Sequence, residues 1–169
     1  LWRPCDAVES TIAWQAAIER RVGPTSLLFS RQNLKHIERT ESQINNIKRG
    51  GYTLIEGSDD PELIIIATGS EVEIAVDVAT ELNSKNRNIR VISMPSTDVF
   101  DKQDEQYKET VLPFSCRSRV AIEAGVTDYW KKYVGLDGLA LGVDNFGESA
   151  PAKNVFEYFG LTKNNLKKV

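Results

Sequence analysis

From residue 62 to the end of the chain, short apolar runs alternate with longer amphipathic segments. The apolar runs predict strands at 62–67, 88–94, 117–123 and 139–144, and the amphipathic segments predict helices at 71–85, 101–112, 127–134, 150–159 and 162–168. Strands that alternate with helices in this way pair in parallel through right-handed crossovers. With a further short strand at 52–55, residues 52–169 are predicted to form a compact α/β domain, a three-layer α/β/α fold with a mostly parallel five-stranded sheet.

The first fifty residues follow a different pattern. Apolar positions recur at helical spacing over 6–21, with Asp6 as the expected N-cap and Glu9 three residues on, as in a capping box. Gly23-Pro24 ends that helix, and the apolar run after it predicts a strand at 25–30. Because one helix and one strand cannot bury both of their faces, residues 1–30 are expected to pack on further chain or on the next domain. Residues 31–51 are polar and predict a linker with a short helix at 40–48.

Composition and charge narrow the classes of partner. Hydrophobic residues make up 41% of the 169-residue chain, and the net charge of −3 without a basic stripe gives no reason to expect a nucleic acid. The apolar runs are far shorter than the roughly 20 residues of a membrane span, and no signal peptide is visible, so no membrane partner is expected. Two distant cysteines, Cys5 and Cys116, favour reduced thiols in a cytoplasmic protein. The first residue is Leu1 rather than methionine, so we expect the chain to be part of a longer one.

The segment Ser30-Arg31-Gln32-Asn33-Leu34 is the strongest candidate for binding chemistry. It follows the predicted strand at 25–30, and a guanidinium at the end of a strand is a planar, permanently charged group suited to an anion. Gln32 and Asn33 add hydrogen-bonding groups. An arginine near a linker is also commonly exposed or ion-paired without any function. The residues alone leave these two interpretations of Arg31 equally supported.

Other polar residues favour structural roles. The turn Thr68–Glu73 lies between a strand and a helix, where phosphate-binding loops occur, but Glu71 and Glu73 in the first helical turn would repel a phosphate. Ser70 and Glu73 are therefore predicted to form a capping box. His36 is the only histidine, lacks a nucleophile or metal-ligand partner in the pattern, and is expected at the surface. Glu123 ends a strand and could face a crevice as a functional carboxylate, but capping or pairing with a basic neighbour is favoured.

Two further motifs favour packing and helix initiation. In Tyr129-Trp130-Lys131-Lys132-Tyr133, Trp130 and Val134 share one helix face and the lysines another, which indicates an apolar packing face rather than base stacking. Near the end of the chain, Ser149 is expected to cap a helix that has Pro151 in its first turn. No nucleophile–base pair, metal site or cofactor loop is evident in the sequence, so no catalytic, cofactor or metal residue is predicted.

Several of these motifs, taken in order, resemble the closing third of transketolase. They are Trp2-Arg3-Pro4-Cys5-Asp6, Ser30-Arg31-Gln32-Asn33-Leu34, Ala67-Thr68-Gly69-Ser70-Glu71-Val72-Glu73, Ser93-Met94-Pro95-Ser96-Thr97, Phe100-Asp101-Lys102-Gln103, Glu123-Ala124-Gly125, Asp128-Tyr129-Trp130, Lys132-Tyr133-Val134-Gly135 and Phe146-Gly147-Glu148-Ser149-Ala150-Pro151. The resemblance covers nearly the whole chain and is closer to bacterial-type transketolase than to the pyruvate dehydrogenase β subunit.

The resemblance implies an enzyme that moves a two-carbon ketol unit between ketose and aldose phosphates in the pentose phosphate pathway. It implies a cytoplasmic homodimer that depends on thiamine diphosphate and Mg²⁺, with all cofactor ligands upstream of Leu1 and none in this chain. Arg31 matches the family arginine that holds the substrate phosphate, whereas His36 inherits no role. Residues 1–30 would be the end of the pyrimidine-binding domain, 31–51 a linker and 52–169 the C-terminal domain.

On this basis the chain is expected to be inactive alone and to contribute a phosphate contact and support for the dimer. The alternative is a non-catalytic assembly or regulatory ligand-binding module, with a crevice near Gly69, Pro95 and Glu123, where strands are predicted to end.

Overall fold

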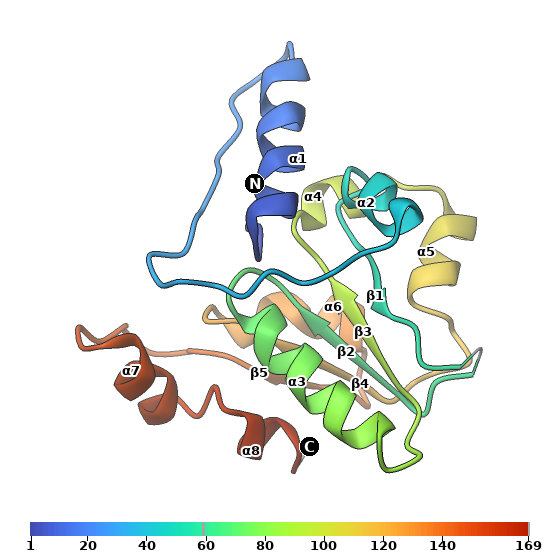
Figure 1. The fold of residues 1–169 in the computed structure, drawn as a ribbon, viewed down its shortest axis with the longest axis vertical. Coiled ribbons are helices and arrows are strands. Elements are labelled where there is room, and N and C mark those ends of the chain that lie inside the picture. Colours follow the sequence, from blue (N-terminus) through green and yellow to red (C-terminus); the bar gives the residue numbers. More distant parts are fainter. Residues whose placement is uncertain (59, 169) are drawn as a thin grey trace.

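A single mixed sheet organises the molecule, whose computed structural model describes residues 1–58 and 60–168 (Figure 1). Within these residues the strands are β1 (Tyr52–Ile55), β2 (Leu63–Ala67), β3 (Ile89–Ser93), β4 (Arg119–Ile122) and β5 (Leu139–Leu141), in the order β1-β3-β2-β4-β5. Strands β3, β2, β4 and β5 pair in parallel, and β1 pairs antiparallel with β3. The predicted five-stranded, mostly parallel sheet is confirmed.

Helices cover both faces of the sheet, as the three-layer prediction requires. On one face lie α1 (Ala7–Glu19), α2 (Glu41–Ile47), α3 (Glu71–Asn83), α7 (Ala152–Tyr158) and α8 (Lys163–Leu166); on the other lie α4 (Thr97–Phe100), α5 (Glu105–Val111), the 3₁₀ helix η1 (Thr127–Trp130) and α6 (Lys131–Val134). Alternate residues of β2 enter the two cores, Ile65 the first and Ile64 and Ile66 the second. Strand β2 is therefore almost continuously apolar because both of its faces are covered.

The predicted strand at 25–30 is wrong. This segment forms only one isolated bridge, between Leu27 and Trp2, and Leu28 and Phe29 are about half exposed. A strand needs a neighbouring strand along its length, and Trp2 is the only residue that pairs with it among those described. The apolar run therefore reflects side chains that pack locally, such as Phe29 on the Trp14 ring, with 6.3 Å between ring centroids.

Two helix boundaries also differ from the prediction. The expected helix at 101–112 begins only at Glu105, because Asp104 caps it by accepting a hydrogen bond from the Tyr107 amide at 2.8 Å. The expected capping box of Ser70 with Glu73 does not form, since the Ser70 hydroxyl instead bonds to the Glu71 carboxylate at 2.7 Å. The turn before α3 is made by Gly69, whose positive φ of 58° suits glycine.

Other helix termini follow the expected chemistry in part. Asp6 caps α1 by accepting from the Glu9 amide at 3.1 Å, as predicted. At the start of α7, Pro151 itself occupies the N-cap position. The prediction that Ser149 caps this helix and that Pro151 lies in its first turn is therefore wrong. The short helix expected at 40–48 is α2, which begins with a capping box formed by Thr40 and Gln43.

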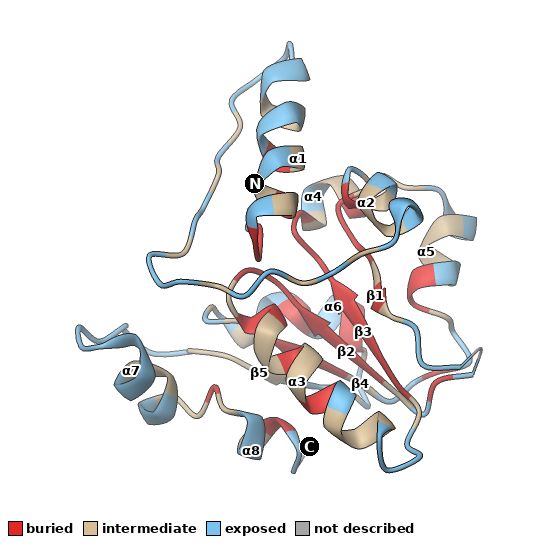
Figure 2. Ribbon diagram, in the orientation of Figure 1, coloured by how far each residue is buried: buried red, intermediate tan, exposed pale blue. Residues whose placement is uncertain are grey.

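Helix α1 extends away from the sheet, and most of its outer surface is exposed (Figure 2). Its exposed side chains include Trp14 and Ile18, at 54% and 70% exposure, and Val22 follows at 82%. None of the described helices is long and apolar enough to span a bilayer. The chain from Arg20 to Thr40 has no helix or longer strand, and it returns from the tip of α1 to the sheet.

Candidate functional site

Arg31 lies on an exposed loop that both flanks tie to the first residues of the chain. We call residues 28–37 the Arg31 loop. At one end the Leu28 amide donates to the Trp2 carbonyl at 2.9 Å, and at the other the Ile37 amide donates to the Asp6 carboxylate at 3.3 Å. No residue in the described part of the chain forms a hydrogen bond or ion pair with the Arg31 guanidinium. The group is therefore free to meet an anion.

A shallow cavity of about 400 Å³ lies directly beside this loop, within the range of roughly 300–1,000 Å³ that is usual for ligand pockets. It is lined by Pro4, Asp6, Ala7, Ser10, Phe29, Ser30, Gln32, Asn33 and Leu34. The neighbours of Arg31 in the sequence thus face the start of α1, with two amide side chains among them. The lining offers uncharged hydrogen-bonding groups and the Asp6 carboxylate, which is paired with Arg39, while Arg31 itself lies outside the lining.

Beneath the loop, a charged network is buried between α1, the segment 37–39 and the sheet. The Arg39 side chain is 1% exposed and donates to the Asp6 carboxylate at 2.6 Å. The Glu9 carboxylate is fully buried and accepts from the Tyr52 hydroxyl at 2.8 Å and from the Ser93 hydroxyl at 2.5 Å. We call Asp6, Glu9, Arg39, Tyr52 and Ser93 the buried polar network.

This environment changes the acid–base behaviour of two neighbours. Burial raises the pKa of the Cys5 thiol far above its ordinary value, and the adjacent Glu9 carboxylate raises it further. Burial likewise raises the pKa of the Tyr52 phenol, again reinforced by Glu9. Both groups therefore stay protonated at neutral pH, so Cys5 is no nucleophile and Tyr52 acts as a hydrogen-bond donor.

A second polar cluster lies at the carboxyl ends of β2, β3 and β4. The crossover after β2 runs to α3 on one face of the sheet, while those after β3 and β4 run to the other face, so the loops diverge there. Open α/β sheets bind ligands at such a switch point. We call this hollow of about 380 Å³ the sheet-edge crevice; its lining includes Arg3, Thr68, Pro95, Ser96, Glu123 and Trp130.

The chain's own Arg3 fills part of this crevice. Its backbone amide donates to the Pro95 carbonyl at 2.8 Å, and its carbonyl accepts from the Gly69 amide at 3.0 Å. Its guanidinium pairs with Glu123 and lies 3.3 Å from the Glu71 carboxylate. Burial raises the pKa of Glu71, although Arg3 partly offsets the effect. The charges in the crevice are therefore directed at one another.

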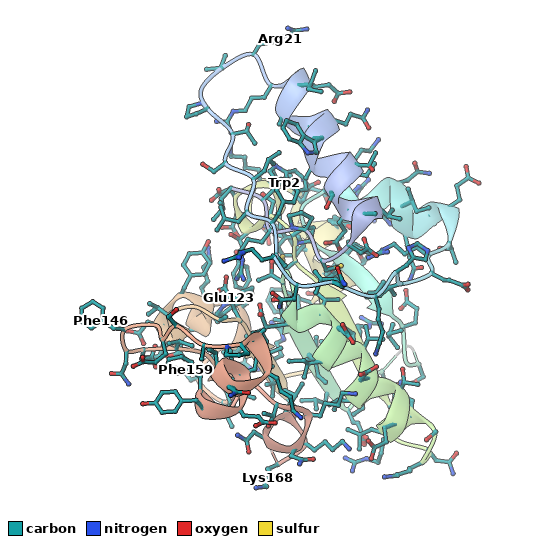
Figure 3. All side chains as sticks on the ribbon, turned by 60° about the vertical axis from the view of Figure 1, so that its left-hand side comes forward. Trp2, Arg21, Glu123, Phe146, Phe159 and Lys168 are labelled. Atoms are coloured by element: carbon teal, nitrogen blue, oxygen red, sulfur yellow. The ribbon has the colours of Figure 1, made fainter. Side chains whose placement is uncertain are left out.

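Glu123 pairs with a basic residue, which is the role that the sequence favoured. One carboxylate oxygen of Glu123, which is labelled in Figure 3, accepts from Arg3 and the other from the Trp130 indole at 2.7 Å. The crevice predicted near Gly69, Pro95 and Glu123 is present. One polar group in it is unsatisfied among the described residues, the buried Ser96 hydroxyl. The regulatory-ligand alternative remains a prediction.

The remaining candidates take structural positions. His36 is exposed, as expected. Trp130 and Val134 are buried while both lysines are exposed, which confirms the packing face, and Lys132 also lies 4.8 Å from the centroid of the Tyr129 ring. No group of three or more His, Cys, Asp or Glu side chains in the described part of the chain could hold a metal ion.

Arg3 and Arg39 are the two basic residues of these clusters, and no role is predicted for either from the sequence. Arg39 lies in a polar stretch whose composition is typical of a solvated linker, and Arg3 is separated from Glu123 by 120 positions. A local pattern cannot reveal such pairings. One available signal was the motif Trp2-Arg3-Pro4-Cys5-Asp6, which contains the anchoring side chains of Arg3 and Asp6.

Comparisons with known proteins identify related sequences over nearly the whole chain. The family model of the transketolase-like C-terminal domain matches residues 50–162. Transketolase 1 of Escherichia coli and transketolase 1 of Vibrio parahaemolyticus are 58% and 57% identical to this chain over 165 residues. Each alignment covers 98% of this chain and 25% of the relative, so the chain spans about a quarter of the length of these relatives.

Solved structures of transketolases resemble this chain over nearly its whole length. The structure of Pichia stipitis transketolase in complex with sedoheptulose 7-phosphate has a TM-score of 0.88 and 36% identity. The similarity covers 99% of this chain and 24% of that one. The likeness therefore includes helix α1 and the Arg31 loop as well as the sheet.

Proposed function

This chain belongs to the transketolase family, and from that premise we propose that it is the C-terminal part of an enzyme that transfers a two-carbon ketol unit between ketose and aldose phosphates. Within that enzyme, Arg31 binds the phosphate of the sugar substrate. The single observation that supports this role is an exposed guanidinium with no partner among the described residues, held on a loop fixed at both ends. A fixed positive charge on a non-reacting phosphate orients the reacting carbonyl.

The chemical step itself is assigned to other parts of the complete enzyme. Thiamine diphosphate and Mg²⁺ belong to the proposal as cofactors of that enzyme, and the family resemblance assigns their ligands to its other parts. The chain is accordingly expected to have no ketol-transfer activity alone. Both cysteines are free and buried, which is consistent with the proposed cytoplasmic location.

The apolar surface of α1 supports a larger assembly. Trp14, Ile18, Val22 and Phe29 together expose large apolar side chains on and beside one helix. Grouped exposed apolar residues of this kind mark an interaction surface. We assign this surface to contact with the rest of the enzyme, in which residues 1–30 belong to the pyrimidine-binding domain and the complete protein is a homodimer.

The Arg31→Ala variant of the complete, cofactor-loaded enzyme tests the proposal. Loss of a charge-assisted bond costs about 1.5–3 kcal/mol, which corresponds to a fall of roughly 10- to 150-fold in kcat/KM for a phosphorylated sugar. Turnover of an unphosphorylated sugar should stay within about twofold, because it never used the contact. Arg117→Ala is the matched control, since Arg117 is also exposed and pairs with Asp137 at the surface, away from the Arg31 loop.

An equal loss for both sugars would remove the phosphate role of Arg31. Measurable ketol transfer by the 169-residue chain alone would overturn the assignment of the chemistry to other parts of the enzyme.

A further inference from the structure

We infer that Asp6 and Arg39 are positioning residues, which hold the Arg31 loop at a fixed place relative to the sheet so that Arg31 meets the substrate phosphate. This inference rests on the proposed function. Their side chains are 2% and 1% exposed and are paired with each other, so neither charge is presented to a substrate. They act on the loop from beneath.

Arg39 joins the end of the loop to α1 and to β1. Its guanidinium donates to the Asp6 carboxylate and to the Ile37 carbonyl, both at 2.6 Å, and its Nε donates to the Tyr52 hydroxyl at 2.7 Å. The remaining nitrogen lies 3.2 Å from the Cys5 sulfur. A planar fork with this many partners has one orientation, which a lysine could not reproduce.

Asp6 fixes two elements with one carboxylate. One oxygen caps α1 through the Glu9 amide, and the other accepts from the Ile37 amide at 3.3 Å and from Arg39. The start of the helix and the end of the Arg31 loop are therefore tied to the same side chain. Because a cap and an ion pair meet there, a displacement of either element would break bonds to the other.

The sheet supplies the fixed reference. Glu9 accepts hydrogen bonds from Tyr52 on β1 and Ser93 on β3, and these two residues are paired across the strands. From the other side, Arg3 anchors the same N-terminal segment to the carboxyl ends of β2, β3 and β4. The path runs from the sheet through residues 3–9 to Ile37 and the loop, and every link in it is an identified contact.

The network is better explained by geometry than by stability. A buried ion pair can commonly be replaced by apolar residues without loss of stability, so its presence is weak evidence of a stabilising role. The buried polar network lies under the segment from Arg20 to Thr40, a connection of some 20 residues without regular structure. A side chain on such a segment has a fixed position only where other contacts hold the backbone in place.

The test is Asp6→Asn in the complete, cofactor-loaded enzyme. Asparagine keeps the shape and the N-cap but removes the charge that Arg39 needs. We expect kcat/KM for a phosphorylated sugar to fall between about 10- and 100-fold, as for a displaced binding group, and that for an unphosphorylated sugar to change less than about twofold. Asp128→Asn is the matched control, because Asp128 is exposed and pairs with Lys131 at the surface.

Tyr52→Phe gives a milder second variant in case Asp6→Asn fails to fold. It removes the acceptor of Arg39 Nε and one donor to Glu9, and it should give a smaller loss of kcat/KM that is confined to the phosphorylated sugar.

In the 169-residue chain, hydrogen exchange provides a readout that needs no catalysis. The Ile37 amide should exchange at least about tenfold faster in Asp6→Asn, while amides of β2 and β3 keep their rates.

The outcomes separate the inference from the function on which it rests. If Arg31→Ala weakens only the phosphorylated sugar but neither Asp6→Asn nor Tyr52→Phe does, the positioning role is wrong and the proposed function stands. A loss for both sugars in Asp6→Asn, or an unchanged Ile37 amide, also overturns the positioning role. If Arg31→Ala is itself unselective, the proposed function fails first.

Discussion

Replacing Glu123 by glutamine removes one charge from the sheet-edge crevice while keeping the shape of the side chain. In the native chain both carboxylate oxygens accept hydrogen bonds, one from Arg3 and the other from the Trp130 indole at 2.7 Å. The amide nitrogen of glutamine would place a donor against one of these two donors. Whichever donor meets the amide nitrogen loses its acceptor; where that donor is Arg3, its guanidinium keeps only the longer contact with Glu71, at 3.3 Å.

The size of the effect follows from burial. The side chains of Arg3 and Glu123 are 20% and 16% exposed, so the pair is shielded from most of the solvent. A hydrogen bond to a charged group contributes about 1.5–3 kcal/mol, and we expect a loss of about 2 kcal/mol in the free energy of unfolding. For a chain of this size that corresponds to a fall of about 4–8 °C in Tm.

The assay is thermal and urea unfolding of the 169-residue chain, with Glu148→Gln as the control. Glu148 is exposed, and its replacement removes the same charge from the molecule, so it should change stability by less than about 0.5 kcal/mol. A double-mutant cycle with Arg3→Gln should give a coupling of at least about 1 kcal/mol. Equal Tm values for Glu123→Gln and Glu148→Gln would refute the claim that the crevice anchors the N-terminal segment.

Two further predictions concern the same domain. Burial raises the pKa of Glu71 above its ordinary value of 4.5, so the folded protein binds this proton more tightly than the unfolded chain does. The free energy of unfolding therefore falls as the pH rises from 4.5 towards the raised pKa. Glu71→Gln should remove that part of the pH dependence of the urea midpoint, and an unchanged dependence would contradict the prediction. Ile65→Ala, at a fully buried site in β2, should cost about 2–5 kcal/mol in urea unfolding, whereas Leu136→Ala, at 99% exposure, should cost less than about 0.5 kcal/mol; comparable losses would contradict the assigned core.

The sheet was predictable because its pattern is local. Strand β2 is a short apolar run and β3 is mostly apolar, and both are buried on their two faces. Helix α3 between them is amphipathic, so the type and order of these elements could be inferred without knowledge of the fold. The strand expected at 25–30 failed for the opposite reason. An apolar run becomes a strand only where a partner strand lies beside it, and that depends on the whole chain.

The candidate site was only half predictable. Arg31 stood out because an arginine after an apolar run is an unusual local feature, and its role in binding phosphate stays a prediction. The groups that hold its loop were missed because charged residues in a polar stretch normally indicate solvent. The Arg39 side chain is instead nearly inaccessible, and its partners include the N-cap of helix α1 and Tyr52 of strand β1. Burial of a charge follows from three-dimensional packing, which the order of residues does not reveal.

The first thirteen residues of this chain complete the interior of a domain that begins some forty positions later. Trp2, Cys5 and Ala13 are part of the same apolar core as strands β1 and β3. A protein cut near residue 50, where the family match begins, would leave Ser93 and Tyr52 without their carboxylate acceptor and Glu123 without its cation. Anyone who trims this molecule for crystallisation, screening or fusion should therefore keep its N-terminal segment attached.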